Sequence, residues 1–249
     1  MTAGGLLIIN ADDWGLDQPG TDAILRCVEA GAVTSTSAMV FMADSQRASR
    51  LARGVPAGLH INLTEPFTGS GVDAALRRRQ GRLVDYFAGP KWRRWGLSPA
   101  LFAEIELCIA EQLAEFRNLY GREPSHFDGH QHIHQSLGVL AARTIPTAAK
   151  MRPSLTFSPG EKWWPNRAYR SLLNRALRTR FRAPRYLFSI ADMHPALGGS
   201  ALEEKLALSS GSAVEVMTHP AWDDELAVLL DPRWTALIGQ RRVGSYEQL

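Results

Sequence analysis

The sequence predicts a protein of the α/β class: one parallel-stranded domain, open or closed into a barrel. Two observations carry this prediction. Short apolar or β-branched runs alternate with helix-patterned segments, and no repeat, low-complexity tract or linker divides the 249 residues. Polar side chains able to do chemistry follow several of the apolar runs, as expected where parallel strands share one carboxyl edge. A chain of this length is ordinary for one α/β barrel, so we expect a single domain over residues 1–249.

The composition is that of a folded globular protein. The chain holds 28 Lys and Arg against 25 Asp and Glu, a net charge of +3, and 45% of its residues are hydrophobic. This balance excludes disordered and collagen-like classes. We find no apolar run long enough to cross a bilayer and no basic segment before an apolar core at the start, so we expect a cytoplasmic protein without a transmembrane segment. The two cysteines, Cys27 and Cys108, are predicted to be buried thiols.

The first third of the chain alternates strand and helix patterns. Residues 6–9 form an apolar run typical of a strand buried on both faces, which opens into a polar loop at Asn10. Apolar residues at helical spacing, followed by Gly31, predict a helix over residues 19–30. We expect a strand at 33–41, a helix at 45–53 and a strand at 57–63.

The middle of the chain contains the clearest helix. Residues 99–120 carry an apolar stripe, with Pro99 at the start and Gly121 at the end. The preceding segment, 66–98, lacks strong periodicity, and we interpret it as an insertion or loop. Further strands are predicted at 126–128, 186–190 and 213–217.

Two groups of candidate site residues occur early in the sequence. Asp12 and Asp13 are adjacent carboxylates directly after a buried strand, where burial and mutual repulsion raise their proton affinity unless a cation lies beside them. A capping or solvated role is the alternative. His60 and Asn62 lie on one face of a strand whose other face is apolar, so His60 is either a hydrogen-bonded structural residue or a functional one.

Histidines are concentrated in one segment of the chain. Four of the seven lie within residues 126–134, together with Asp128. An extended segment would place Asp128, His130, His132 and His134 on one face, whereas a helical turn after Gly129 would pair His130 with His134. Imidazoles with a carboxylate are the usual ligands of zinc and suit other divalent metals, while a polar loop is the alternative. His219 also follows an apolar run, and we interpret His194 as a structural loop residue.

At this point the sequence resembles a known family, the YdjC/ChbG carbohydrate deacetylases, a branch of the polysaccharide-deacetylase-like enzymes. The resemblance rests on five blocks in the family's order: LIINADDWGL (7–16), GAVTSTSAMV (31–40), GLHINLT (58–64), FDGHQHIH (127–134) and THP (218–220). Residues 66–98 and 150–212 match weakly. The family usually has an aromatic residue after the Asp pair, often Phe, and this chain has Trp14.

The resemblance implies a distorted (β/α) barrel that holds one divalent metal, most simply Mg or Zn. It also implies a role for each matching residue. Asp13, His60 and His130 match the metal ligands, Asp12 the general base and His219 the general acid. The resemblance makes His132 a pocket residue, and we add three residues within the blocks as pocket candidates: Trp14, Asn62 and Asp128.

The implied reaction is removal of an N-acetyl group from an amino sugar in an oligosaccharide or glycoconjugate, with release of acetate. Because Asp12 must be ionised while His219 is protonated, a bell-shaped pH profile is expected. Two alternatives stay open. The same ligands suit a metal-dependent amidohydrolase or phosphoesterase on another substrate, and a non-catalytic module that binds anionic glycans is the alternative from a different class.

Basic and aromatic residues outside the motifs are candidates for binding a partner or a substrate. Residues 162–185 hold eight Lys or Arg and no acid, which indicates either a solvated helix face or a surface for an anionic glycan, a phosphate-bearing lipid or a membrane. Four tryptophans are candidates for sugar stacking or for filling the core: Trp92, Trp95, Trp163 and Trp164. No nucleic-acid-binding motif is present, and apolar surfaces on helices outside a barrel would permit a homodimer.

Overall fold

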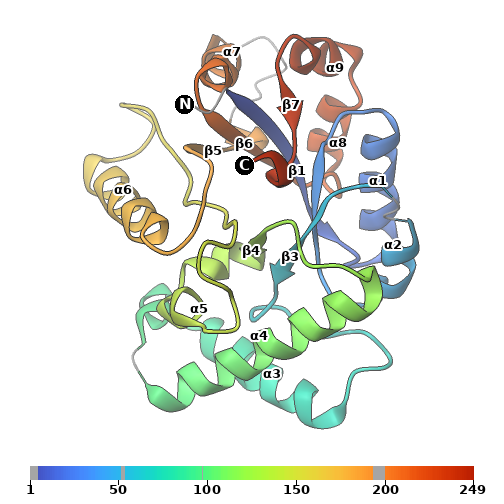
Figure 1. The fold of residues 1–249 in the computed structure, drawn as a ribbon, viewed down its shortest axis with the longest axis vertical. Coiled ribbons are helices and arrows are strands. Elements are labelled where there is room, and N and C mark those ends of the chain that lie inside the picture. The colour runs from blue at the N-terminus through green and yellow to red at the C-terminus, as the bar shows by residue number, and fades with distance from the viewer. Residues whose placement is uncertain (1–4, 52–53, 97, 193–199) are drawn as a thin grey trace.

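The computed structural model of the protein describes residues 5–51, 54–96, 98–192 and 200–249. Its strands form one parallel sheet in the order β4-β3-β2-β1-β6-β5, and β7 pairs with the beginning of β1. The strands are β1 (Leu6–Trp14), β2 (Ser35–Ala38), β3 (Ala57–Ile61), β4 (Phe127–Gly129), β5 (Tyr186–Ser189), β6 (Ala213–Thr218) and β7 (Val243–Gly244). Because every pairing is parallel, all strand carboxyl ends lie at one edge of the sheet (Figure 1).

One irregular segment, residues 150–156, connects the two edge strands. On one side the backbone amide of Phe127 in β4 donates to the carbonyl of Lys150, and the amide of Arg152 donates back to Phe127. On the other side the amide of Thr156 donates to the carbonyl of Leu187 in β5. The sheet is therefore curled into a half-barrel whose open side is spanned by segment 150–156, and the predicted α/β class is confirmed.

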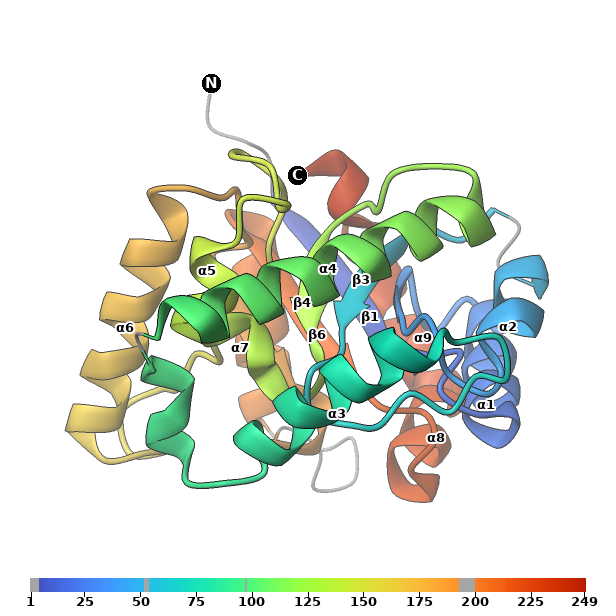
Figure 2. The ribbon, with the colours of Figure 1, turned by 90° about the horizontal axis from the view of Figure 1, so that it is seen from below.

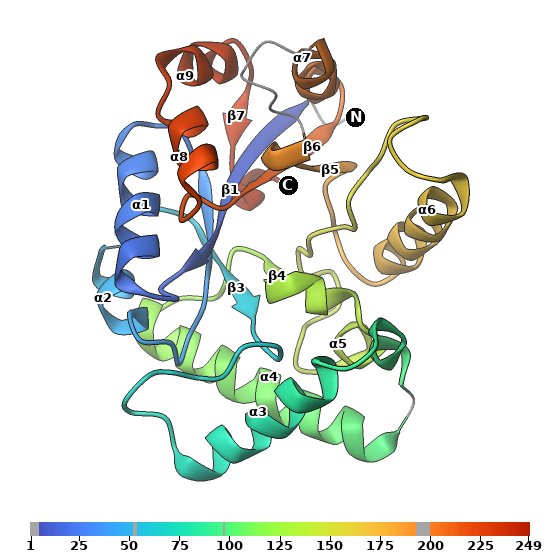
Figure 3. The same ribbon diagram turned by 180° about the vertical axis from the view of Figure 1, so that it is seen from behind.

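Helices surround the curled sheet. In Figures 1 and 3, α1, α8 and α9 lie beside β1, α3 and α4 cover the region below β3, and α6 stands at the outer edge of the molecule. Figure 2 shows α4 running across β3 and β4. The longer helices are α1 (Gln18–Glu29), α2 (Ser45–Leu51), α3 (Ala74–Phe87), α4 (Pro99–Tyr120), α6 (Trp164–Arg178), α7 (Ser200–Ala207), α8 (Asp223–Leu229) and α9 (Pro232–Gly239). The short ones are α5 (Leu137–Ala141), η1 (Lys91–Trp95), η2 (His130–Gln135), η3 (Ile190–Asp192), η4 (Leu208–Ser210) and η5 (Tyr246–Gln248).

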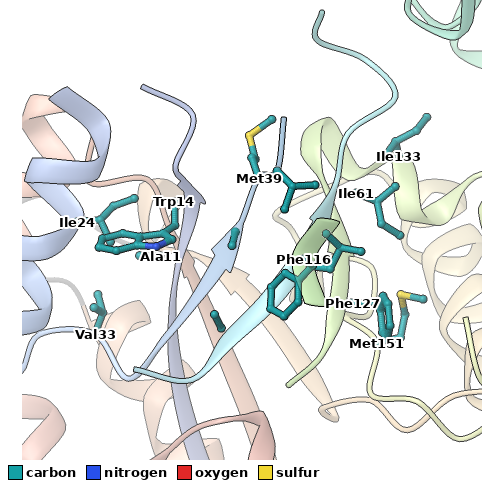
Figure 4. Packing of buried hydrophobic residues seen from close by; sticks show 14 of the residues in the cluster. Ala11, Trp14, Ile24, Val33, Met39, Ile61, Phe116, Phe127, Ile133 and Met151 are labelled. Carbon is teal, nitrogen blue, oxygen red and sulfur yellow. The ribbon is translucent and has the colours of Figure 1, made fainter. Parts of the chain in front are cut away.

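The hydrophobic core lies on both faces of the sheet. Figure 4 shows Trp14 and Ile24 among the side chains toward α1, and Ile61 with Phe116 of α4 on the other side of β2. Each of these four side chains is at most 1% exposed. A parallel strand covered on both faces must be apolar on both, which is why residues 6–9 form a continuous apolar run rather than an alternating one.

Several helices begin and end where their sequence signals predict. The α1 helix occupies residues 18–29 instead of 19–30, and the Asp17 carboxylate caps it by accepting the Gly20 amide at 2.8 Å. The α4 helix matches its predicted range of 99–120, because Pro99 starts it and Gly121, with φ 64°, ends it. The strands predicted at 33–41 and 57–63 are shorter in the structure, at Ser35–Ala38 and Ala57–Ile61.

The structure corrects the prediction for residues 66–98. This segment contains the 14-residue α3 helix and the η1 turn, instead of being only a loop. The buried positions of α3 follow helical spacing: Leu76, Gln80, Leu83 and Phe87. The pattern is hard to recognise in the sequence because Gln80 is polar and because Gly81 and three consecutive arginines lie among these positions.

A second correction concerns the ends of β1 and β4. The β1 strand continues through the Asp pair to Trp14, so Asp12 and Asp13 belong to the strand and not to a loop after it. Residues 130–135 are neither extended nor regularly helical, because Gln131 and His132 have φ values of 51° and 59° inside a 3₁₀ turn. His194 lies outside the described residues. Among the helices described, none is both long and apolar enough to cross a membrane.

Candidate active site

The predicted chemical residues converge at the carboxyl edge of the sheet. Asp12 and Asp13 end β1, His60 lies near the end of β3, and His130 and His219 directly follow β4 and β6. Parallel strands bring such positions together regardless of their separation in sequence, and ligands of open α/β sheets bind at this edge. A single site therefore draws its side chains from four strands.

A backbone irregularity aims both aspartates of the pair at this site. The register between β1 and β2 shifts between Ala11 and Trp14, and Asp13 has a φ of 69°. A regular strand would send neighbouring side chains to opposite faces, but a left-handed residue interrupts that alternation. Asp tolerates this conformation better than most residues, so the sequence accommodates the strain at Asp13.

Asp13, His60 and His130 form a compact cluster. The Asp13 Oδ1 atom lies 3.3 Å from Nε2 of His60 and 3.0 Å from Nδ1 of His130. One ligand atom from each residue lies within 4.8 Å of the other two. The side chains of Asp13 and His130 are 17% and 16% exposed, so a ligand can reach this point from solvent. One carboxylate and two imidazoles are a donor set that fits a divalent metal.

A second group of potential ligands, Asp12, His60 and Asp128, is fully buried. Both carboxylates of this group already accept hydrogen bonds from a guanidinium, and His60 Nδ1 lies 2.8 Å from Asp128 Oδ1. The first cluster, which has free access and no such neutralising partner, is therefore the better metal position.

Asp128 holds the His60 ring in place through a hydrogen bond to the nitrogen that faces away from Asp13. With Asp128 bonded to Nδ1 of His60, the Nε2 atom is directed at Asp13. Ser37 of β2 donates its hydroxyl to Asp128 Oδ2 at 2.7 Å. Such a carboxylate behind an imidazole fixes the orientation of the ring and increases its basicity as a ligand. We therefore assign Asp128 to supporting His60, in place of the predicted contact with substrate.

The electrostatics of the cluster favour a cation. Burial would lower the pKa of His60, but the charge and hydrogen bond of Asp128, together with Asp13 and Asp12, raise it to about 10. For Asp13, burial opposes ionisation, yet the two histidines lower its pKa below the usual range. The field that favours a charged imidazole here also favours a divalent metal ion.

Arg152, carried by segment 150–156, occupies the centre of the half-barrel and was not predicted as a site residue. Its Nη1 and Nη2 atoms each donate to one oxygen of Asp12 at 2.6 Å, a bidentate pair. Arg152 Nη1 also lies 2.8 Å from Asp128, and Nε donates to Glu215 at 2.9 Å. Burial would lower the pKa of Arg152, but the three carboxylates raise it well above its usual value. The guanidinium is therefore permanently charged and holds Asp12 in one orientation.

Glu215 is the second residue that sequence reasoning missed. It lies in the apolar β6 strand, is fully buried, and accepts the hydroxyl of Tyr246. Burial raises the pKa of Glu215 to about 7, because Arg152 and Tyr246 offset the desolvation only in part. A charged residue inside an otherwise apolar strand is a sequence signal that could have identified it. Together with Asp12 and Asp128, Glu215 makes three carboxylates that surround one permanent cation.

His219 lies on the other side of Asp12. Its Nε2 atom is 3.9 Å from Asp12 Oδ2, and its Nδ1 atom is 3.8 Å from Glu225 Oε1. The ring stacks on Trp222, with centroids 4.4 Å apart. Burial would lower the pKa of His219, but the neighbouring carboxylate of Glu225 and the charges of Asp12 and Asp13 outweigh it, so the pKa is raised.

Of three further residues predicted to line the pocket, two are buried in structural roles and one is partly exposed. Trp14 is 1% exposed and belongs to the hydrophobic core, so the sequence-based assignment to the pocket is corrected. Asn62 is fully buried and holds the turn after β3, since its side chain donates to the Glu65 carbonyl and accepts the Glu65 amide. His132 is partly exposed, and its Nδ1 atom has no hydrogen-bond partner within the described residues. Of the three, only His132 remains available to a ligand.

The fold and site together define a class: a parallel α/β half-barrel whose carboxyl edge combines an Asp–His–His cluster with an Arg-bound carboxylate and a second histidine. The sequence profile of the family described as YdjC-like protein matches residues 6–242. The chain belongs to the YdjC family, as its motifs predict.

The curated relatives of this chain are named as deacetylases. The chain is 37% identical over 134 residues to a chitooligosaccharide deacetylase of Serratia marcescens, covering 50% of that protein. A human carbohydrate deacetylase is 38% identical over 143 residues, and 42% of its length is covered. The chain thus spans half or less of these two relatives. A chitooligosaccharide deacetylase of Klebsiella pneumoniae is 30% identical over 237 residues, with 89% of this chain and 83% of that protein covered.

Solved structures share the fold. A protein of Enterococcus faecalis, provisionally described as a cellobiose-phosphate cleavage protein, superposes with a TM-score of 0.67 at 22% identity, covering 98% of both chains. An uncharacterised protein of Agrobacterium tumefaciens gives a TM-score of 0.52 at 16% identity, covering 97% of this chain and 86% of the other. At this identity the likeness supports the half-barrel architecture alone.

Proposed function

We propose that the protein is a metal-dependent hydrolase that removes the N-acetyl group from an amino sugar, as in chito-oligosaccharides, and releases acetate. The observation that carries the proposal is the Asp13–His60–His130 cluster beside the Asp12–Arg152 pair and His219. The names of the relatives supply the substrate class, an N-acetylated amino sugar in an oligosaccharide or glycoconjugate.

Asp13, His60 and His130 would hold one divalent metal ion. When bound there, the ion would supply Lewis-acid polarisation of the acetamide carbonyl and lower the pKa of a water molecule. Two imidazoles and one carboxylate suit Zn²⁺, and Mg²⁺, which prefers oxygen ligands, is the second candidate.

Asp12 would accept the proton of the attacking water. The bidentate pair with Arg152 keeps the carboxylate in one orientation, and Asn10 donates a further hydrogen bond to Asp12 Oδ1 at 2.8 Å. Oδ1 accepts hydrogen bonds from both Arg152 and Asn10, whereas Oδ2 accepts one from Arg152 alone and retains a lone pair, and Oδ2 is the oxygen nearer His219. A base fixed in this way loses little orientational freedom when the reaction begins.

His219 would donate a proton to the departing amine. Since Glu225 and the Asp pair raise its pKa, the imidazole is charged over more of the neutral range than a free histidine. Its Nε2 atom lies 3.9 Å from Asp12, so acid and base can reach opposite sides of one amide bond. Protonation is required because an amine leaves poorly as an anion.

The test is acetate release from N,N′-diacetylchitobiose and longer chito-oligosaccharides. Metal-stripped protein is resupplied with single divalent metals and compared with three variants, Asp12→Asn, His130→Ala and the surface control Glu123→Gln. We expect one metal per chain in the parent, Asp12→Asn and the control, and weakened metal binding in His130→Ala. Asp12→Asn should lose about 10²–10⁴-fold in kcat, the usual contribution of a general base.

Two outcomes would contradict the proposal. Absence of metal binding by the folded parent would remove the assigned cluster, and metal-dependent hydrolysis of phosphate esters without acetate release would favour the phosphoesterase alternative. A cytoplasmic location and a homodimer remain predictions from the sequence.

A further inference from the structure

The α6 helix presents an apolar stripe to solvent in addition to the face that packs on the protein. Only Leu173, Asn174 and Leu177 of this helix are buried. The four residues Trp164, Ala168, Leu172 and Ala176 follow one another at intervals of four, and all are exposed. Residues at this spacing form one continuous ridge on a helix. A surface helix usually has a polar outer face, so this ridge requires a different explanation.

Further aromatic side chains extend the exposed apolar region. Trp163 is 76% exposed and Trp92 of η1 is 69% exposed. Trp95 of η1 contacts Tyr169 of α6, with ring centroids 5.8 Å apart, so the two elements are neighbours. Of the ten large hydrophobic residues described as exposed, six come from these two elements and the residue preceding α6: Trp92, Trp95, Trp163, Trp164, Tyr169 and Leu172. We call these six residues and α6 the α6 surface.

The α6 surface is also strongly basic. A groove of about 690 Å³ runs between α6 and residues 155–157, and its lining contains five arginines and no acid: Arg167, Arg170, Arg175, Arg178 and Arg185. The sequence contains no Asp or Glu within residues 88–98 or 162–185. Within the described part of the chain, the guanidinium groups of Arg167 and Arg175 have no hydrogen-bond or ion-pair partner. Unpaired guanidinium groups beside exposed tryptophans call for an anionic partner with an apolar layer.

We propose that the α6 surface docks on the surface of a bilayer that contains anionic phospholipids. The tryptophans and Leu172 would lie at the level of the headgroups, where amphipathic aromatic rings are stable, and Arg167 and Arg175 would pair with phosphates. Helices that bind in the interface plane combine such an apolar ridge with a basic face. At the periphery of the molecule, α6 can meet a flat surface without rearrangement of the half-barrel (Figures 1 and 2).

Two other occupants fit the observations less well. A second copy of the chain joined through a twofold axis at α6 would bring the basic surfaces of the two copies together, and α6 contains no acid to offset their repulsion. Nucleic acid would pair with the arginines and stack on the tryptophans, but it would leave the aliphatic part of the ridge, which contains Leu172 and two alanines, without an apolar partner.

The test is flotation of the full chain with vesicles of phosphatidylcholine, with and without phosphatidylglycerol. We expect binding only to the anionic vesicles, decreasing as salt is added. In the double variant Trp164→Glu with Leu172→Glu, the affinity for these vesicles should fall by about tenfold or more, since two inserted side chains are lost and two repelling charges added. Arg167→Gln with Arg175→Gln should weaken binding and reduce its salt dependence.

The matched control is Leu107→Glu with Leu208→Glu, which replaces two exposed leucines elsewhere and should bind as the parent does. Thermal unfolding verifies that each variant is folded. Acetate release from soluble substrate should be unchanged in the α6 variants, so a failure of docking is separable from a failure of the proposed reaction. Parent protein that does not bind anionic vesicles at low salt would overturn the proposal. The proposal would also be overturned if the parent formed a dimer that the Trp164→Glu, Leu172→Glu variant does not form. Binding of random oligonucleotides that is tighter than binding of vesicles, and that is lost in this variant, would overturn it as well.

Discussion

At the scale of single residues, Arg152 is the group on which the site depends most. It is fully buried and pairs with Asp12, Asp128 and Glu215, which lie on three different strands. A buried charge remains stable only while its partners are in place, because an unpaired ion in the interior carries a large desolvation cost. The same guanidinium therefore orients the proposed base Asp12 and, through Asp128, supports the ring of His60.

Arg152→Lys should separate orientation from charge. Lysine keeps the positive charge but lacks the planar fork that binds both oxygens of Asp12. We expect kcat for acetate release to fall by about 10²-fold, the size of effect that a misplaced catalytic group produces, with one metal still bound per chain. Steady-state kinetics and metal analysis check this. A variant with the parent's kcat would show that the fork does not position Asp12.

The pH dependence of the reaction should report His219. The charged imidazole is the active form, and its pKa is raised in the protein, so activity is present below that pKa and is lost as the pH rises through it. The alkaline limb of kcat/KM should therefore lie above pH 6.5, the ordinary value for histidine. In Glu225→Gln one source of the raised pKa is removed, and this limb should move to lower pH. An unchanged limb would assign it to another group.

The sequence identifies residues whose type is distinctive and misses those whose role depends on tertiary placement. Asp13, His60 and His130 stand out because histidines and paired aspartates after apolar strands are unusual, and the structure brings them within reach of one another. Arg152 follows no motif, and nothing local distinguishes it from other arginines in a chain rich in them. Its role arises because segment 150–156 crosses the open side of the half-barrel.

At the scale of elements, β3 and β4 are held in register partly by a close approach at Gly58. A Cβ atom at this position would lie 2.3 Å from the ring of His126, which stacks on Tyr246 and hydrogen-bonds to Ser37. Glycine is therefore required here for space and not for an unusual backbone conformation. His126 in turn contacts Ser37, the residue that donates to Asp128, so packing at Gly58 bears on the site.

Gly58→Ala should destabilise the protein, whereas Gly81→Ala should not. The first change forces a buried ring to move and should cost about 1–3 kcal/mol in the free energy of unfolding. Gly81 lies inside α3 with nothing within 4 Å of its added Cβ, so alanine there should add about 0.5–1 kcal/mol of stability. Denaturant unfolding of both variants measures whether the free energy of unfolding falls or rises. Equal effects would show that the Gly58–His126 contact is unimportant.

Helices that have both an apolar stripe and residues that mark their ends could be predicted from the sequence, and elements without these features could not. The α4 helix has apolar residues at regular spacing between Pro99 and Gly121, and its bounds match. The α3 helix buries Gln80 and contains Gly81, so its periodicity is weak in the sequence although its packing is regular. In η2, the left-handed Gln131 and His132 result from tertiary contacts, which neither strand nor helix periodicity describes.

At the scale of the whole molecule, metal binding at the proposed cluster should contribute to stability. Asp13 and His60 come from β1 and β3, and His130 directly follows β4, so a metal that joins them binds the folded chain and not the unfolded one. At a metal concentration of 100 times Kd the gain is about 2.7 kcal/mol, which for a chain of this size corresponds to a Tm increase of roughly 5–10 °C.

Thermal unfolding with and without a chelator measures this difference. His130→Ala should have the same Tm in both conditions, and Glu123→Gln should respond as the parent does. A chelator-insensitive parent that nevertheless retains one metal per chain would contradict the assumed preference for the folded state.

The central position of β1 has a consequence for synthesis on the ribosome. This strand precedes the other strands of the sheet in the chain, but one of its two main neighbours, β6, begins at Ala213, and β7 follows at Val243. Until more than 200 further residues have been made, one edge of this strand, whose residues 6–12 are buried in the folded protein, remains without its partner. Contacts so distant in sequence close slowly, so this edge of β1 stays open to aggregation while the intervening residues are made.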